Sequence, residues 1–240
     1  MALLIPLLIL FLGPMTGVII NSRLKITQHR FIGYSVLFSG AFLLGIALFG
    51  LMPEMFSNIK QAGIWLAVGF FSQIVIEKFT GGVDHGHIHS HEVPKNILVL
   101  YVGLFLHALF EGYSAGLINY QSTQFVSGMV IGIALHEIPA AFALSVLLHQ
   151  RIKNKNSRTG LLIFYTLASP IGYFIGVYVH SESLISEHVS QIITAVIAGT
   201  FLHISTTILF ENTMWKKEGL KKWGFIMAGI IVSYFACAIG

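Results

Sequence analysis

Charged residues are scarce in this chain: Asp, Glu, Lys and Arg together make up 10% of its 240 residues. Soluble domains carry about 25% charged residues, so this composition cannot cover a globular surface that faces water. The chain is 55% hydrophobic, with a mean hydropathy of +0.79. These figures exclude an ordinary soluble domain and predict an all-α integral membrane protein whose surface contacts the lipid bilayer.

Further absences narrow the class. A single cysteine, Cys237, excludes an intrachain disulfide framework. No Gly-x-x-x-x-Gly-Lys-Ser/Thr motif for ATP is present, so a metal or proton gradient would have to supply the energy for any transport. The net charge of +4 resides in short loops and does not suggest a nucleic-acid partner. We expect neither an organic cofactor nor an enzymatic activity.

Long apolar stretches dominate what is present. A membrane-spanning helix needs roughly 20 mainly apolar residues, and eight such stretches form one predicted transmembrane domain over 1–240, with a His-rich cytoplasmic loop at 80–94. The first stretch lacks the preceding basic residues of a signal peptide and is predicted to be a membrane helix. The predicted spans are 2–20, 31–52, 62–79, 95–118, 124–149, 159–180, 188–210 and 223–240.

The distribution of basic residues tests this count. If the N-terminus lies outside, 13 of the 14 Lys and Arg residues fall on the cytoplasmic side, and only Lys60 falls on the other. Basic loops face the cytoplasm in membrane proteins, and a miscounted span would scramble the bias. We therefore predict eight spans with both termini outside, in the cytoplasmic membrane. The sequence is also compatible with a homodimer.

Ionisable residues inside two successive spans are the main functional candidates. His107 and Glu111 are four residues apart on one face of the fourth span, and the adjacent His136 and Glu137 lie in the fifth. Intramembrane ionisable residues are functional candidates by default, and imidazoles with carboxylates suit Zn²⁺ or Fe²⁺. We therefore predict a metal site, the alternative being a His–Glu network that only ties helices together. Because neighbouring side chains on a helix diverge by about 100°, Glu137 can face a second ion, a proton path or another helix.

Weaker candidates for metal binding lie elsewhere, and Ser169 in the sixth span is one of them. His203 lies in the seventh span beside Ser and Thr residues, where an interhelical hydrogen bond is the alternative to a metal or proton role. The loop at 80–94 has the alternating histidines of a weak metal chelator, although a plain polar connector is the alternative. These loop histidines are His85, His87, His89 and His91.

These motifs resemble those of the ZIP (Zrt/Irt-like) family of divalent-metal transporters. Residues 136–140, His-Glu-Ile-Pro-Ala, resemble the family's His-Glu-Ile-Pro-His/Glu, and residues 107–112, His-Ala-Leu-Phe-Glu-Gly, resemble its His-Asn-x-x-Asp/Glu-Gly. Residues 198–202, Ala-Gly-Thr-Phe-Leu, resemble the start of its seventh-helix signature. The resemblance covers essentially the whole chain.

The resemblance implies a transporter that moves zinc, or iron or manganese, into the cytoplasm without ATP. It implies a main metal site of His107, Glu111 and His136, with Glu137 facing a second, adjacent site. The chain departs from the family pattern at four positions, which predicts a one-ion pathway in place of a binuclear one. The departures are Ala108 for Asn, Ala140 for His or an acidic residue, Ser169 for Glu and Gly50 for His.

Two other functions stay open beside transport. A non-transporting metal sensor or scaffold would keep the same ligands. An intramembrane metalloenzyme is the third reading, but the His-Glu-x-x-His motif is incomplete because residue 140 is Ala.

Overall fold

Helices account for almost all of the described chain, which in this computed structural model comprises residues 3–23, 29–80, 97–118, 123–211 and 219–238. No strand occurs within these ranges. The elements are α1 (Leu4–Arg23), α2 (His29–Gly45), the π-helical turn η2 (Ile46–Leu51), α3 (Met52–Asn58), α4 (Ala62–Thr80), α5 (Ile97–Ile118), α6 (Thr123–Arg151), α7 (Lys155–Thr166), α8 (Ala168–Ser181), α9 (Glu187–Glu211) and α10 (Gly219–Ala238).

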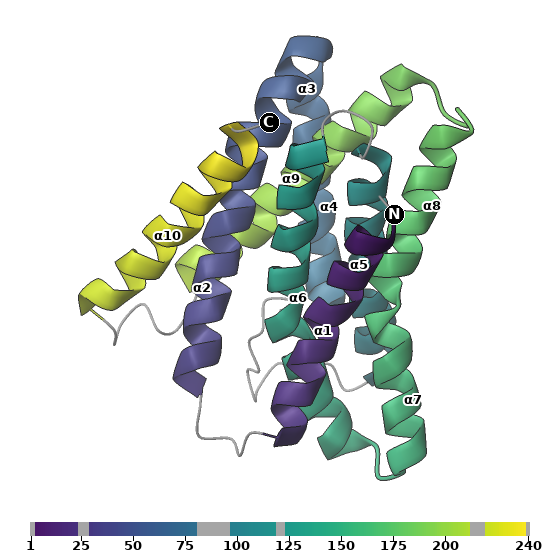
Figure 1. Cartoon of the computed structure of the whole chain (residues 1–240), viewed down its shortest axis with the longest axis vertical. Coiled ribbons are helices and arrows are strands. Elements are labelled where there is room, and N and C mark those ends of the chain that lie inside the picture. Colours follow the sequence, from purple (N-terminus) through teal and green to yellow (C-terminus); the bar gives the residue numbers. More distant parts are fainter. Residues whose placement is uncertain (1–2, 24–28, 81–96, 119–122, 212–218, 239–240) are drawn as a thin grey trace.

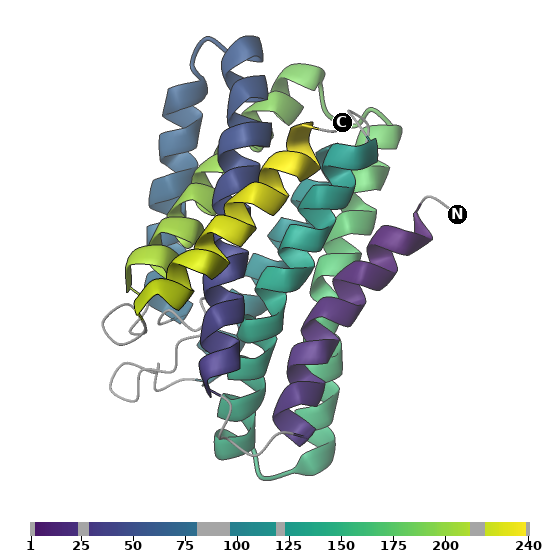
Figure 2. The same cartoon turned by 60° about the vertical axis from the view of Figure 1, so that its left-hand side comes forward.

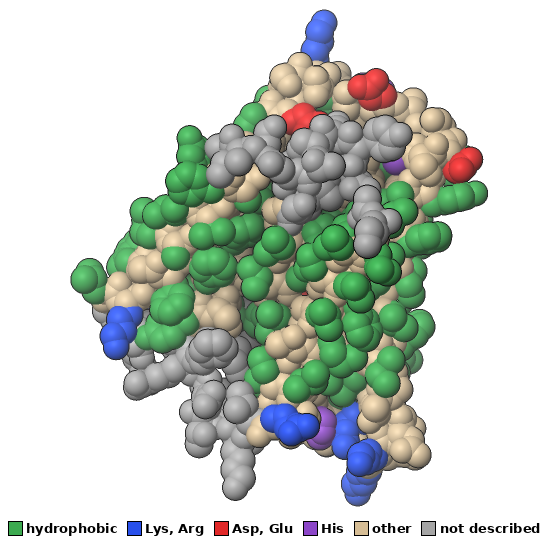
Figure 3. Space-filling view, viewed as in Figure 1, with side chains coloured by type: hydrophobic (Ala, Val, Ile, Leu, Met, Phe, Trp, Pro, Cys, Tyr) green, Lys and Arg blue, Asp and Glu red, His purple; other side chains and the backbone are tan. Residues whose placement is uncertain are grey.

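The predicted all-α membrane class is confirmed. Within the described residues, seven helical segments are long and apolar enough to cross a membrane. Apolar side chains cover much of the face of the bundle shown in Figure 3. The seven segments correspond to the predicted spans with the exception of 62–79, which α4 covers. The count of eight spans and the outside location of both termini stay predictions.

The helices form two groups; most lie close to the long axis of the bundle, whereas α10 crosses it obliquely (Figures 1 and 2). In the first group, α1 packs along α6 and α5 packs along α8; in the second, α4 packs along α9 and α2 along α10. The groups meet where α2 contacts α6 and where α5 faces α4 and α9. In α6, 72% of the apolar window is buried, against 22% in α1 and in α10, so α6 lies at the centre of the bundle.

Glycines allow α5 and α8 to approach closely. A Cβ atom at Gly112 would overlap the backbone of Ser169, and one at Gly172 would overlap the backbone of Leu109. Small residues permit such backbone contact between helices in lipid, where dispersion and interhelical hydrogen bonds drive association. This contact brings the first turn of α8 against the part of α5 that carries His107 and Glu111.

The run formed by α7 and α8 is interrupted at Leu167, three residues before Pro170. A proline has no amide hydrogen, so Pro170 cannot donate to the carbonyl of Thr166, where α7 ends. Ser169 therefore lies in the first turn of a new helix, directly beside α5.

Candidate metal site

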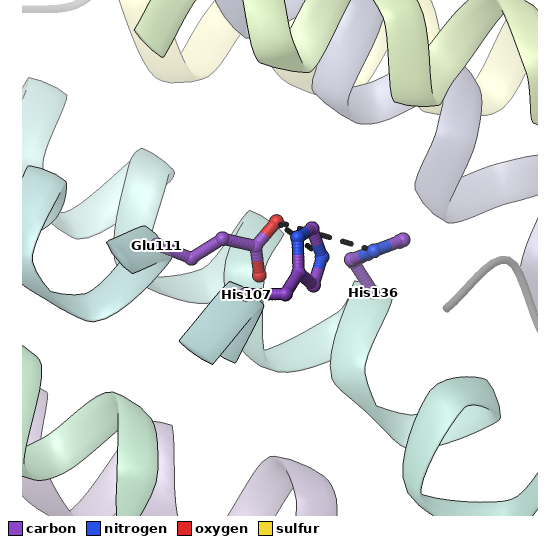
Figure 4. A group of neighbouring side chains, drawn as sticks. All are labelled: His107, Glu111 and His136. Carbon is purple, nitrogen blue, oxygen red and sulfur yellow. Dashed lines mark ion pairs between the residues drawn. The ribbon is translucent and has the colours of Figure 1, made fainter. Parts of the chain in front are cut away.

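Three ionisable side chains from α5 and α6 converge in the interior of the first helix group (Figure 4). The Nε2 atom of His107 lies 3.5 Å from Oε1 of Glu111, one helical turn further along α5. The Nε2 atom of His136, on α6, lies 4.0 Å from the same oxygen. We call His107, Glu111 and His136 the triad; each offers one potential ligand atom, and these atoms lie within 4.8 Å of one another.

All three triad residues are buried: His107 is 6% exposed, Glu111 3% and His136 1%. The two imidazole rings meet edge to face, with their centroids 5.9 Å apart. Placing an ionisable residue at the centre of a membrane helix costs about 3 kcal/mol even on the lenient insertion scale. A cluster of three such groups therefore calls for a compensating partner or function.

The spacing of the triad suits a divalent transition metal. Zn²⁺ binds His nitrogen and carboxylate oxygen at about 2.0–2.2 Å with tetrahedral geometry, which separates two ligand atoms by roughly 3.4 Å. The observed separations of 3.5 and 4.0 Å are close to that value. Small side-chain movements would therefore allow all three atoms to contact one ion. The ligand roles themselves stay a prediction.

Glu137 is separated from the triad by its orientation on α6. The hydroxyl of Ser169 on α8 lies in hydrogen-bond contact with Glu137 Oε1, and it also lies 3.1 Å from the carbonyl oxygen of Ala108 on α5. Both side chains are fully buried, with Glu137 1% and Ser169 0% exposed. Ser169 thus links α8 to α5 and α6 at the level of the triad. One carboxylate oxygen of Glu137 is already in contact with the Ser169 hydroxyl.

His203 does not join the triad. Its Nε2 atom lies 2.6 Å from Oε2 of Glu77, which links α9 to α4 within the second helix group. The ring also packs edge to face against Phe70, with centroids 5.0 Å apart. Glu77 was not among the predicted site residues, although a carboxylate inside the predicted span 62–79 was a signal for a buried partner.

A cavity of about 440 Å³ lies between α4, α5 and α9, on the side of the triad where the two helix groups meet. His107 and Glu111 line it, and Gln73, Ser114 and Thr200 add polar groups to a largely apolar wall. A second volume of about 320 Å³ between α4 and α5 also includes His107. The α5 residues of the triad therefore border open space, and His136 is not among the described residues that line either volume.

The remaining predicted candidates lie outside what the structure describes. The loop histidines His85, His87, His89 and His91 fall within residues 81–96, which are not among the described residues. Their metal-binding role stays a prediction.

Membrane-length helices that bury imidazoles and a carboxylate at one point define a polytopic membrane protein with candidate metal ligands in its core. A comparison with known families identifies it further, since the family described as ZIP zinc transporter matches residues 82–236. This protein belongs to the ZIP zinc transporter family. The matched region includes the whole triad, Glu137 and Ser169.

Individual relatives agree with the family assignment. The chain is 32% identical over 155 residues to Protein zntD of Dictyostelium discoideum, covering 58% of this chain and 22% of that protein. It is 30% identical over 156 residues to zinc transporter ZIP9 of Micropogonias undulatus, covering 60% and 49%. The match to zinc transporter ZIP1 of Danio rerio, at 23% identity, covers 85% of this chain and 83% of that protein. The chain thus spans half or less of the first two relatives.

Proposed function

We propose that this protein transports zinc, or a related divalent transition metal such as iron or manganese, and that the triad binds the ion. The observation that carries the proposal is the convergence of three buried ligand atoms within 4.8 Å in a member of the ZIP family. Two imidazoles and a carboxylate suit Zn²⁺ or Fe²⁺ better than Ca²⁺ or Mg²⁺, which prefer all-oxygen shells. Several relatives bear the name zinc transporter, which supports zinc as the substrate.

We further propose that the ion moves into the cytoplasm without ATP, through a protein of the plasma membrane with eight spans and both termini outside. The one-sided distribution of Lys and Arg supports this topology. The family is one of transporters, which supports transport over enzymatic turnover. A homodimer is compatible with the proposal.

The triad is proposed to bind a single ion. Glu137 is the nearest further carboxylate along α6, but its Oε1 atom is in contact with the Ser169 hydroxyl. Ala108 and Ala140, which offer no side-chain ligand, are both buried. Ser169 is therefore proposed to support Glu137 and not to bind metal itself.

Uptake of ⁶⁵Zn by proteoliposomes tests the transport proposal. We expect uptake by the wild-type protein and near-background uptake by His136→Ala, because this change removes one of three ligands. His188→Ala is the matched control, since His188 is exposed at the start of α9, and it should transport normally.

A non-transporting sensor would bind zinc in equilibrium dialysis and yet show no uptake in the wild-type protein. A metalloenzyme would likewise show no uptake. Full uptake by His136→Ala would contradict the triad as the transport site while leaving transport itself intact.

A further inference from the structure

Basic residues cluster at one end of the first helix group, in two sequence segments that contain no acidic residue. Seven of the chain's 14 Lys and Arg residues lie in segments 19–30 and 149–158, and neither segment contains Asp or Glu. Five of the seven have described side chains, at the end of α1, the end of α6, the α6–α7 connection and the start of α7. We call these five residues the basic end: Arg23, Arg151, Lys153, Lys155 and Arg158.

Specific contacts hold the three helices of the basic end together. The Asn21 amide on α1 donates to the Ser145 hydroxyl on α6 at 2.8 Å, and it lies 3.4 Å from Nδ1 of the exposed His149. The Arg158 guanidinium of α7 donates to the carbonyl of Ile152 at 3.3 Å, which fixes the α6–α7 connection. In Figure 3, Lys and Arg side chains gather at this lower end of the bundle, and the visible acidic side chains lie at the opposite end.

The charge of the basic end is not neutralised by the described protein. None of the ion pairs found among described residues includes any of its five members. The connections of the second helix group differ, because Asp84 and Glu92 accompany the basic residues after α4, and Glu211 and Glu218 accompany those before α10. The segments 19–30 and 149–158 therefore carry more net positive charge than the connections after α4 and before α10.

The basic end lies at the border of the lipid-facing surface. On α1, Ile19 is 50% exposed one turn before Arg23, and on α7 the side chains of Ile163 and Phe164 are exposed about two turns after Lys155. A phospholipid bound here would place its headgroup phosphate among the basic side chains and its acyl chains along this apolar surface. A free phosphate ion would use only the cations.

We propose that the basic end binds the headgroup phosphate of an anionic phospholipid. Clusters of four to eight Lys and Arg at the membrane surface attract anionic lipids. Arginine forks match phosphate oxygens, and the basic end includes three arginines at the ends of packed helices. The inference rests on surface charge and does not depend on the transport proposal.

Native mass spectrometry of the full-length protein in detergent tests this site. Wild-type protein is mixed with equal amounts of phosphatidylglycerol and phosphatidylcholine, and we expect phosphatidylglycerol to dominate the bound states. The variant Arg23→Gln/Arg151→Gln/Lys153→Gln removes three exposed cations that make no described hydrogen bond, and it should lose about tenfold or more in phosphatidylglycerol binding. The control Lys60→Gln/Lys78→Gln/Lys221→Gln removes the same charge elsewhere and should bind normally.

Three results would overturn the proposal. Equal binding of the two lipids by wild-type protein would exclude a headgroup-selective site. This comparison uses only the wild-type protein, so it does not depend on whether the variants fold. Equal losses in the two triple variants, at matched thermal unfolding, would indicate diffuse attraction by net charge. Complete displacement of the lipid by inorganic phosphate would identify a site for the free anion.

Discussion

Two groups of His and Glu side chains lie in this bundle, and they differ in how close their nitrogen and oxygen atoms come to one another. In the triad, the imidazole nitrogens stay 3.5 and 4.0 Å from the Glu111 oxygen, and the cavity of about 440 Å³ borders two of the three residues. In the pair of Glu77 and His203, nitrogen and oxygen are 2.6 Å apart. The first arrangement has room for an ion among its ligand atoms, and the second is closed by a direct hydrogen bond.

The difference shows that residue type alone does not define a metal site in a membrane. Glu77 and His203 are of the same residue types as Glu111 and His107. They differ because Glu77 and His203 form a direct hydrogen bond with each other. In the triad, neither imidazole nitrogen comes as close to the Glu111 oxygen, because the distances are 3.5 and 4.0 Å. We expect metal to bind where buried ligand atoms converge without closing on one another in direct hydrogen bonds.

The largest expected effect comes from Glu111→Ala, which should reduce zinc uptake to background. Glu111 supplies the one carboxylate of the triad, and without it two neutral imidazoles would face a dication in a low-dielectric site. Initial-rate uptake in proteoliposomes at matched protein content measures the effect. Glu182→Ala, an exposed change of the same type, serves as the control, and substantial uptake by Glu111→Ala would exclude the triad as the site.

A smaller loss is expected for Glu137→Ala. The Glu137 carboxylate contacts Ser169 and lies outside the triad, so its removal leaves all three proposed ligands in place. Uptake should fall by about 10-fold, less than for Glu111→Ala, since changing a residue that supports metal ligands typically costs about 10- to 100-fold. If Glu137→Ala proves more damaging than Glu111→Ala in the same assay, Glu137 belongs to an intact second site and the one-ion proposal is wrong.

His203→Ala and Glu77→Ala should affect stability more than metal binding. The pair joins α9 to α4, and hydrogen bonds between membrane helices contribute about 0.6–1.7 kcal/mol. Thermal unfolding in detergent should show that each single variant is less stable than the wild-type protein. The double variant should be about as stable as the less stable of the two single variants, because both changes remove the same hydrogen bond. Zinc stoichiometry by equilibrium dialysis should stay unchanged, and a lost equivalent of zinc would make this pair a binding site in its own right.

The smallest effect on transport is expected from deletion of residues 84–92. The segment carries the predicted chelating histidines and lies between α4 and α5. Connecting segments outside the packed core tolerate such changes, so the maximal uptake rate should persist while its dependence on metal inside the vesicles changes. Measuring uptake into vesicles preloaded with zinc provides the check. Loss of folded protein would show that the segment is structural.

The sequence predicted the parts of the site that depend on local geometry. The four-residue spacing of His107 and Glu111 placed them on one face of a helix, and the adjacency of His136 and Glu137 predicted diverging side chains; the structure agrees with both. Contacts between distant segments were not predictable in this way. Ser169 is 32 residues from Glu137, and their contact depends on how closely the glycines allow α8 to approach α5.

The same limit applies to the fold. Apolar length predicted the seven helical segments that are long enough to cross a membrane, because this length follows from the bilayer itself. Apart from the fourth and fifth spans, which the predicted metal site brings together, partner helices were not predicted, since lipid-facing and helix-facing surfaces are similarly apolar. Glu77 illustrates the consequence: its partner His203 lies 126 residues away, and no local pattern connects the two.

The cavity beside the triad has a consequence for hydration of the ion. Zinc in proteins is usually four-coordinate, so an ion held by the triad has one position left, and the open space next to His107 and Glu111 allows water to fill it. The ion would then lose its hydration shell in stages and keep one water molecule at the deepest point. Departure could begin by exchange of a single ligand for water, without simultaneous rupture of every bond to the protein.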